Sequence, residues 1–244
     1  MPCRIVAWNI RAGGGYRAEA LTAALRRFNA DIVALSEFRA TAPSGIVARR
    51  LSALGLRYQL TTALAAEPSL NGLLLASRWP LRTMRAERAP SEPGRWLLAE
   101  VAAPQRFALG AMHVPNRVTG RKWTFLDAVL AVAERWRRGP AVLLGDTNSG
   151  RPGIDEESPA FNQREGGWID GLARAGWQDA FRHVRGTARA YTWYSPNGGN
   201  GFRIDQAFLN PGLLPSLVDT RYAWGASRDG RRPSDHAALV LDLA

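Results

Sequence analysis

Continuous apolar runs alternate along the chain with segments in which apolar residues recur every three or four positions. The runs Arg4–Asn9 and Ile32–Ser36 are short and largely apolar, which is typical of strands buried on both faces. Leu21, Leu25 and Phe28 have the spacing of one face of a helix. Strands that alternate with helices in this way predict an α/β fold.

The same patterns predict the other elements. We expect further strands at residues 58–62, 72–77, 81–86, 96–101, 107–113, 141–145, 191–194, 203–210, 217–221 and 237–243. We expect further helices at residues 46–54, 121–136 and 168–175, with Trp123, Leu126, Leu130 and Ala133 on one face of the second. No low-complexity linker and no fixed repeat interrupts the chain. We therefore predict one domain over residues 1–244, a four-layer α/β sandwich in which two mixed β-sheets pack face to face and helices flank them.

The composition is that of an ordinary globular protein, with 46% apolar and 22% charged residues. No apolar run reaches the roughly 18 residues that a membrane span requires, so we expect no membrane partner. The first residues lack a basic and then apolar export signal. Cys3 is the only cysteine, so no internal disulfide can form, and we expect a cytoplasmic location.

The charge balance favours a partner that carries many phosphates. Lysine and arginine number 32 against 21 acidic residues, a net charge of +11. Lys122 is the only lysine, however, and an arginine-rich composition with abundant alanine and glycine also arises in a GC-rich genome. The arginines in loops that could contact phosphate, or could equally be solvated surface charges, are Arg17, Arg117, Arg121, Arg151 and Arg228.

Polar side chains gather at the ends of the predicted strands. They are Asn9, Glu37, His113, Asp146, Asn148, Asp205, Asp235 and His236. Any one of the Asp and Asn residues could simply form a turn, but the whole set is typical of an active site built on strand ends. Carboxylate and amide oxygens suit Mg²⁺ or Mn²⁺. A zinc-type Cys/His cluster, a GxxxxGK[ST] loop and a GxSxG elbow are all missing.

These clusters, in this order, resemble the endonuclease/exonuclease/phosphatase (DNase I-like) superfamily. The resemblance rests on Ala7-Trp8-Asn9-Ile10, Ala34-Leu35-Ser36-Glu37, residues 72–78, His113-Val114-Pro115-Asn116, Gly145-Asp146-Thr147-Asn148, Arg203-Ile204-Asp205 and Ser234-Asp235-His236. Within it, the segments 168–183 and 191–205 are most similar to exonuclease III-type abasic-site endonucleases. The resemblance implies a metal-dependent phosphodiesterase that hydrolyses the DNA backbone at abasic sites and trims 3′ ends.

The resemblance also implies a role for each residue of the set. Glu37 would bind Mg²⁺ or Mn²⁺, with Asn9 and Asp235 beside it; Asp146 would move a proton; Asn148 would orient phosphate and water; His236, held by Asp205, would bind the phosphate, and His113 would face it. A carboxylate that holds an imidazole fixes its tautomer and favours its charged form.

Five further residues would bind the substrate. Trp193, Phe202 and Ile204 match positions that line the sugar pocket of abasic-site enzymes, although they could instead be ordinary core residues. Asn116 and Arg117 belong to a loop with which the family grips the strand. The expected partner is duplex DNA with an abasic site or a 3′ end, and the expected state is a monomer.

The chain departs from the abasic-site branch in several places. Arg11 stands where Asn or Asp is usual, His113 where Tyr is usual, Ser36 and Phe38 flank Glu37 in place of the common residues, and the loop 195–201 is short. Two alternatives therefore remain open. One is a phosphatase or phosphodiesterase for a small or lipid phosphoester, which Arg11 and His113 favour. The other is a non-catalytic nucleic-acid-binding module, which would not need the acidic and imidazole set.

Overall fold

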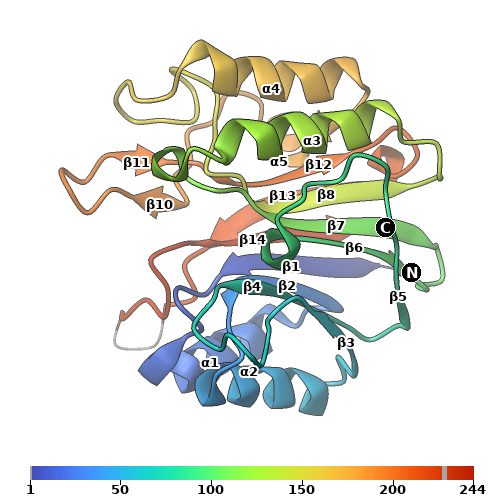
Figure 1. Cartoon of the computed structure of the whole chain (residues 1–244), viewed down its shortest axis with the longest axis vertical. Coiled ribbons are helices and arrows are strands. Elements are labelled where there is room, and N and C mark those ends of the chain that lie inside the picture. Colours follow the sequence, from blue (N-terminus) through green and yellow to red (C-terminus); the bar gives the residue numbers. More distant parts are fainter. Residues whose placement is uncertain (1, 227–229) are drawn as a thin grey trace.

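The computed structural model describes residues 2–226 and 230–244. The first and last strands of the chain lie side by side in its first sheet (Figure 1). The strand order is β13 (Leu217–Ala223), β14 (Ala238–Leu243), β1 (Cys3–Asn9), β2 (Ile32–Phe38), β4 (Gly72–Ser77) and β3 (Tyr58–Thr61). β1 runs parallel to β2 and antiparallel to β14, so the sheet is mixed. The pairing of β1 with β14 agrees with one domain over residues 1–244, which stays a prediction.

The second sheet packs against the first. Its order is β5 (Leu81–Thr83), β6 (Trp96–Val101), β7 (Phe107–His113), β8 (Ala141–Asp146), β12 (Asp205–Leu209) and β9 (Gln178–Asp179). β8 is parallel to β7 and antiparallel to β12. A separate hairpin, β10 (Trp193–Tyr194) and β11 (Gly201–Phe202), projects beyond the sheets (Figure 1).

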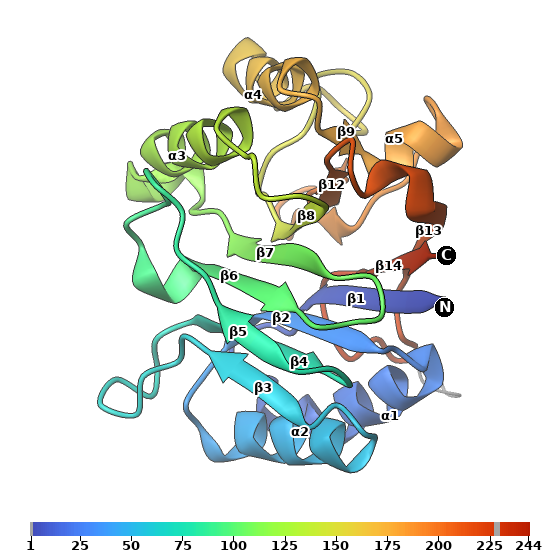
Figure 2. The ribbon, with the colours of Figure 1, turned by 90° about the vertical axis from the view of Figure 1, so that its right-hand side faces the viewer.

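Helices cover the outer face of each sheet (Figure 2). α1 (Ala18–Phe28) and α2 (Ala42–Ala53) lie on the first sheet; α3 (Lys122–Glu134) and α4 (Gln163–Arg174) lie on the second, and α5 (Ala180–Arg185) follows β9. Short 3-10 turns occur at Gly15–Arg17, Pro93–Arg95, Arg117–Thr119 and Leu214–Ser216. The predicted four-layer sandwich with two mixed sheets and flanking helices is confirmed.

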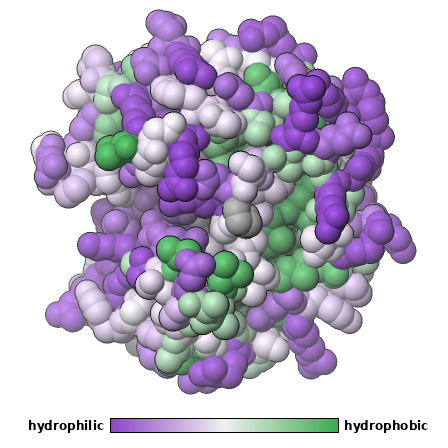
Figure 3. Space-filling view, viewed as in Figure 1, coloured by the Kyte–Doolittle hydropathy of each residue, from purple (hydrophilic) through white to green (hydrophobic). Residues whose placement is uncertain are grey.

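Alternating side chains along the strands explain why the strands are continuously apolar. On β1, Ile5 and Ala7 belong to the core between the two sheets, whereas Val6 and Trp8 pack toward α1 and α2. A third core joins the second sheet to α3 and α4. Both faces of each central strand are therefore buried, and polar residues are confined to the strand ends. On the face drawn in Figure 3, hydrophilic residues ring the molecule and hydrophobic residues show in patches between them.

The face predicted for the helix at residues 121–136, which is α3 in the structure, is only half right. Leu126 and Ala133 are buried, but Trp123 and Leu130 are partly buried, and the buried set also includes Phe125 and Val129. The reason is that α3 contacts two neighbours, the sheet and α4. The guanidinium of Arg164 on α4 lies 4.6 Å from the Trp123 ring centroid. The apolar surface is therefore wider than a single stripe.

Two helices differ from the prediction because local capping was overlooked, and one strand is shorter than expected. α4 begins at Gln163 rather than residue 168, since Asn162 and Glu165 form a capping box. α5 was not expected, and the Asp179 side chain caps it. The strand expected at 81–86 ends at Thr83.

None of the described residues forms a helix long and apolar enough to cross a membrane. The monomeric state and the cytoplasmic location stay predictions.

Candidate active site

Strand register brings the polar residues of the second sheet together. Asp146 at the end of β8 is paired with His113 on the parallel strand β7 and with Asp205 on the antiparallel strand β12. Asn9 ends β1 in the opposite sheet, and its Nδ2 atom donates to Asp146 Oδ2 at 3.0 Å. The two sheets therefore meet at one polar cluster, to which residues far apart in the sequence contribute.

Glu37 is aimed into this cluster by a β-bulge. The pairing of β2 with β4 shifts between Ser36 and Phe38, and Glu37 has a φ of 56°. A bulge re-aims a side chain, and a positive φ is strained for a residue other than glycine. Glu37 Oε1 accepts from Asn9 Nδ2 at 3.2 Å, and Oε2 accepts from the Ala12 amide at 2.7 Å.

His236 and Asp205 form a buried pair. His236 Nδ1 lies 2.9 Å from Asp205 Oδ2, and Nε2 lies 4.0 Å from Asp146 Oδ2. The backbone of His236 is fixed as well, because its carbonyl accepts from the Trp8 indole at 2.8 Å. Burial opposes the charged imidazole, but the Asp205 carboxylate outweighs it and raises the pKa of His236 to about 9. His236 is therefore cationic at neutral pH.

His113 has the opposite character. Its Nε2 lies 3.7 Å from Asp146 Oδ2 and 4.0 Å from Glu37 Oε1. Burial lowers the pKa of His113 to about 4 despite the nearby Asp146 charge, so the ring is neutral at neutral pH. Its Nδ1 atom is buried and has no hydrogen-bond partner among the described residues.

Asp146 is the most central carboxylate. Burial raises its pKa, the Asp205 charge adds to this, and His236 opposes it. Asp146 Oδ1 accepts from the Asn148 amide at 2.9 Å, and Asn148 Nδ2 donates to the Val114 carbonyl at 2.8 Å. The preceding Gly145 has a φ of 136°, and a Cβ there would lie 2.0 Å from the Met112 carbonyl oxygen. Only glycine lets β8 deliver Asp146 at this point.

Two sets of side chains have the chemistry of a metal site. One oxygen or nitrogen from each of Asp146, Asp205 and His236 lies within 4.8 Å of the others, close enough to hold an ion together. His236 would have to lose a proton to ligate, however, and its Nδ1 is engaged by Asp205. Glu37 is more suitable, because its side chain is 23% exposed and Mg²⁺ keeps several waters.

Asn9 and Asp235, the other expected ligands, lie differently. Asn9 directs Nδ2 toward Glu37 and Asp146, while its Oδ1 accepts from the Arg11 amide at 2.9 Å. Asp235 Oδ2 lies 3.7 Å from Arg11 Nε, and its side chain is 39% exposed. A hard divalent cation fits these carboxylate and amide oxygens.

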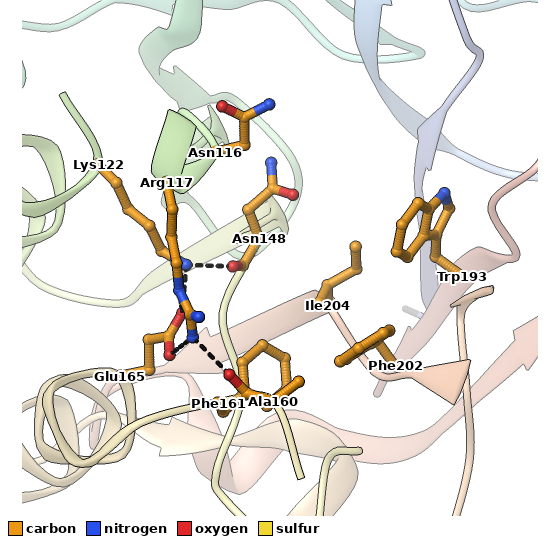
Figure 4. Close-up of a pocket in the computed structure, with 10 residues that line it drawn as sticks. All are labelled: Asn116, Arg117, Lys122, Asn148, Ala160, Phe161, Glu165, Trp193, Phe202 and Ile204. Atoms are coloured by element: carbon orange, nitrogen blue, oxygen red, sulfur yellow. Dashed lines mark hydrogen bonds and ion pairs between the residues drawn. The ribbon is translucent and has the colours of Figure 1, made fainter. Parts of the chain in front are cut away.

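A pocket of about 190 Å³ opens beside the cluster (Figure 4). It is lined by Asn116, Arg117, Lys122, Asn148, Ala160, Phe161, Glu165, Trp193, Phe202 and Ile204. All five residues expected to bind the substrate are in this list. The Trp193 ring centroid lies 5.9 Å from that of Phe202 and 6.3 Å from that of His236. The pocket therefore adjoins the catalytic candidates, and Asn148 belongs to both.

Sequence reasoning missed the wall of the pocket. Phe161 packs edge-on against Phe202 with centroids 5.3 Å apart, and Lys122 and Glu165 are buried behind it. Two signals could have found the last pair: Lys122 is the only lysine, and Glu165 stands three residues after the cap Asn162. Neither signal reveals that the two residues meet.

Most loop arginines are engaged by the protein itself. Arg17 donates to the carbonyls of Ile10, Arg11 and Pro233, Arg121 pairs with Glu92, and Arg151 pairs with Asp170. Arg228 lies outside the described residues. His183, the histidine outside the cluster, is exposed. Arg117 is the arginine of this group that lines the pocket.

The two-sheet sandwich and its cluster of carboxylates, amides and imidazoles define an enzyme that hydrolyses phosphoester bonds. Residues 6–236 match the Endonuclease/Exonuclease/phosphatase family, and the chain belongs to it. It is 27% identical over 249 residues to an exodeoxyribonuclease of Streptococcus pneumoniae, covering 88% of this chain and 86% of that protein. It is 32% identical over 170 residues to the DNA repair nuclease APEX1 of Danio rerio, covering 62% of this chain and 52% of that protein.

Solved structures share the fold. An AP endonuclease from Archaeoglobus fulgidus superposes with a TM-score of 0.80 at 20% identity, over 98% of both chains. The 3′ phosphatase NExo from Neisseria, bound to a product DNA hairpin, superposes with a TM-score of 0.79 at 22% identity, over 99% of both chains.

Proposed function

We propose that this protein is a DNA repair nuclease, a metal-dependent phosphodiesterase that cleaves the backbone on the 5′ side of an abasic site and also trims 3′ ends. The observation that carries the proposal is the small, partly apolar pocket directly beside the Asp146 and His236 cluster. Relatives named exodeoxyribonuclease and DNA repair nuclease support DNA as the substrate. The net charge of +11 also suits a polyanion.

The pocket suits a sugar that has lost its base. Trp193, Phe202 and Ile204 provide an apolar wall, and about 190 Å³ is less than the roughly 300 Å³ at which pockets for drug-sized ligands begin. A sugar without a base is small, and it leaves the duplex cheaply because no stacking or pairing is lost. The pocket would select such a site by excluding complete nucleotides.

A divalent cation, Mg²⁺ or Mn²⁺, would be held by Glu37 with Asn9 and Asp235 beside it. When bound, it would neutralise negative charge that develops on the phosphate. Glu37 is suited to this role because, among the residues that the structure describes, Oε1 is engaged by Asn9 and His113 alone, and its side chain is partly exposed. Asn9 would offer its oxygen after its amide turned, since Nδ2 now faces the carboxylates.

Asp146 would accept the proton of the attacking water. Its raised pKa makes it a better base than an exposed carboxylate, and it is held by Asn9 and by the amide of Asn148. The Asn148 side chain would orient the phosphate and the water. The bond from Asn148 Nδ2 to the Val114 carbonyl restricts that side chain in advance.

His236 would donate a hydrogen bond from Nε2 to a phosphate oxygen. Asp205 keeps the ring cationic and correctly oriented, so the charge is in place before the reaction begins. His113 would contact the phosphate as a neutral ring. Asn116 and Arg117, at the rim of the pocket, would hold the adjoining strand, with Arg117 supplying a positive charge for a phosphate.

The test uses end-labelled duplex DNA with one abasic-site analogue, beside an intact duplex, a single strand and a recessed 3′ end. Each is incubated with Mg²⁺, Mn²⁺ or chelator, and with Asp146→Asn. The expected result is metal-dependent incision at the abasic site that Asp146→Asn abolishes. Cleavage of 3′ ends alone would reject the abasic-site pocket and keep a nuclease.

A phosphatase or phosphodiesterase for a small phosphoester is the second candidate. The modest pocket volume and the pairing of Arg11 with Asp235 favour it. Release of phosphate from small esters without cleavage of any of the four DNA substrates would establish this alternative and reject the first.

A further inference from the structure

Two buried charged side chains and one exposed one bond to each other along one side of the pocket (Figure 4). Lys122 begins α3 and is 2% exposed, Glu165 lies in the first turn of α4 and is 0% exposed, and Arg117 precedes α3. Lys122 Nζ donates to Glu165 Oε1 at 2.5 Å. None of these contacts takes part in the proposed reaction.

Lys122 is also bonded to the loop that follows β8. Its Nζ donates to the backbone carbonyl of Asn148 at 2.5 Å. Asn148 has a φ of 45°, which is unfavourable for a residue other than glycine and persists only where the surroundings enforce it. Asn148 is held at three atoms. Its backbone N–H donates to Asp146, its Nδ2 donates to the Val114 carbonyl, and its own carbonyl accepts from Lys122 on the pocket side.

Glu165 fixes the position of Arg117 in the same way as Lys122 fixes that of Asn148. Its two oxygens receive the Arg117 guanidinium, with Nε at 3.1 Å from Oε1 and Nη2 on Oε2, and Nη2 also donates to the Ala160 carbonyl at 2.9 Å. Glu165 itself is anchored, because Oε2 accepts from the Asn162 amide at 2.8 Å as part of the cap of α4. The position of Arg117 therefore depends on a helix rather than on its own loop.

Packing alone does not explain this cluster. Burying charged groups carries a desolvation penalty, and apolar side chains of similar volume usually stabilise a core as well or better. Burial raises the pKa of Glu165, but its bonds to Arg117 and Lys122 outweigh burial and lower it, so Glu165 stays ionised at neutral pH. A fully bonded charged cluster does fix the geometry of whatever it contacts.

We propose that Lys122 and Glu165 are positioning residues, which together hold Asn148 and Arg117 at a fixed separation across the pocket. The inference rests on the proposed roles of Asn148 and Arg117. Neither Lys122 nor Glu165 contacts the reacting atoms. They act through the Asn148 carbonyl and the Arg117 guanidinium.

The test is the double variant Lys122→Met/Glu165→Gln, which removes both charges, leaves the net charge unchanged and keeps a glutamine to cap α4. The matched control, Arg4→Met/Asp242→Asn, removes the half-buried pair between β1 and β14. Two substrates are used: abasic-site duplex DNA and bis(p-nitrophenyl) phosphate, which is too small to need Arg117. We expect kcat on both substrates to fall about 100-fold, which is the loss that a misplacement of about 1 Å can cause. KM should rise for DNA alone.

A readout without turnover accompanies the kinetics. The Asn148 side-chain amide signals, assigned by their loss in Asn148→Ala, should shift and broaden in the double variant and not in the control. Should the double variant fail to fold, Glu165→Gln alone is used; it loosens Arg117 and should raise KM for DNA with little change in kcat on the small ester. A folded variant with unchanged Asn148 signals and unchanged kcat overturns the proposal. Absence of DNA cleavage by the wild type would reject only the proposed substrate, because the small ester and the Asn148 signals still test the positioning.

Discussion

Nδ1 of His236 lies 2.9 Å from Oδ2 of Asp205, and this bond joins the segment just before β14 in one sheet to β12 in the other. Nδ1–H donates to this carboxylate, and because the raised pKa keeps the ring cationic, Nε2 also carries a proton, 4.0 Å from Asp146 Oδ2. A cationic imidazole and a carboxylate of raised pKa therefore face each other across the space where a phosphate would lie. Both pKa values are raised, which makes Asp146 a better base and keeps His236 charged.

The first prediction concerns the alkaline limit of activity. If a cationic His236 is needed, kcat/KM should hold up to about pH 9 and fall above it, because the pKa of His236 is raised to about 9. Asp205→Asn removes the charge that raises it, so the alkaline limb should move toward the ordinary 6.5 and activity at pH 8 should fall about 100-fold. The pH dependence of kcat/KM measures both, and an unmoved limb in Asp205→Asn would show that His236 is not the group responsible.

The second prediction concerns the cation. Chelator should abolish turnover but leave the fold, because the polar groups of the site already bond to one another. Added Mg²⁺ at 100 times its Kd should stabilise the protein by about 2.7 kcal/mol, or roughly 5–10 °C in Tm. Glu37→Gln should remove this rise. A rise that survives in Glu37→Gln but disappears in Asp205→Asn would place the ion among Asp146, Asp205 and His236 instead.

The third prediction separates the pocket from the core. Trp193 is half-buried, so Trp193→Ala should cost less stability than the about 3–5 kcal/mol typical of a fully buried tryptophan. It should nevertheless lower kcat/KM for abasic-site DNA at least tenfold, since it removes one wall of the pocket. Trp136→Ala, at another half-buried tryptophan just beyond the C-terminal end of α3, is the control. Equal losses of activity in the two variants would count against a sugar pocket.

Much of the fold and of the cluster was predictable because the strands are buried on both faces. Where every interior position is apolar, a carboxylate such as Asp146 or an amide such as Asn9 stands out at the strand end. Parallel pairing of β1 with β2 and of β7 with β8 then brings these ends to one edge. Residue type and place in the sequence carried this part of the prediction.

The contacts that support the catalytic residues were not predictable, because they form between segments that are distant in the sequence. Lys122 and Glu165 are 43 residues apart and meet only because α3 packs beside α4. The direction of the Asn9 amide is set by Arg11 on one side and two carboxylates on the other. No periodicity marks such pairs, since each is a single contact between two elements rather than a repeated face.

The fourth prediction concerns phosphate contacts. If Arg117 binds a backbone phosphate, Arg117→Ala should weaken DNA binding without regard to sequence and reduce the slope of log K against log salt concentration by about one. Arg82→Ala is the matched control, since Arg82 is 74% exposed and pairs with Glu100 away from the pocket. Binding is measured by titration at several salt concentrations with catalytically inactive Asp146→Asn as the background. An unchanged slope in Arg117→Ala would mean that Arg117 pairs with Glu165 and makes no contact with a phosphate.

The last prediction concerns the buried network that supports β12. Arg203 is fully buried, and its guanidinium bonds to Asp155 and Asp179 while Tyr222 joins it to the Asp205 carbonyl. Burial raises the pKa of Asp155, but Arg203 outweighs burial and the pKa lies below its ordinary 3.8. A depressed folded pKa contributes stability that is present above 3.8 and is lost as pH falls through the lower folded value.

The free energy of unfolding should therefore decline below about pH 4 in the wild type, and urea titrations from pH 7 to pH 2 would follow it. Asp155→Asn leaves Arg203 with half of its charge partners, so it should cost about 3–5 kcal/mol at pH 7 and flatten the decline at low pH. Asp170→Asn is the control, because Asp170 pairs with Arg151 and is about half exposed. Since Tyr222 connects this network to Asp205, Asp155→Asn should also reduce activity under conditions where the protein is fully folded. Normal activity in folded Asp155→Asn would confine the network to stability and separate it from the catalytic cluster.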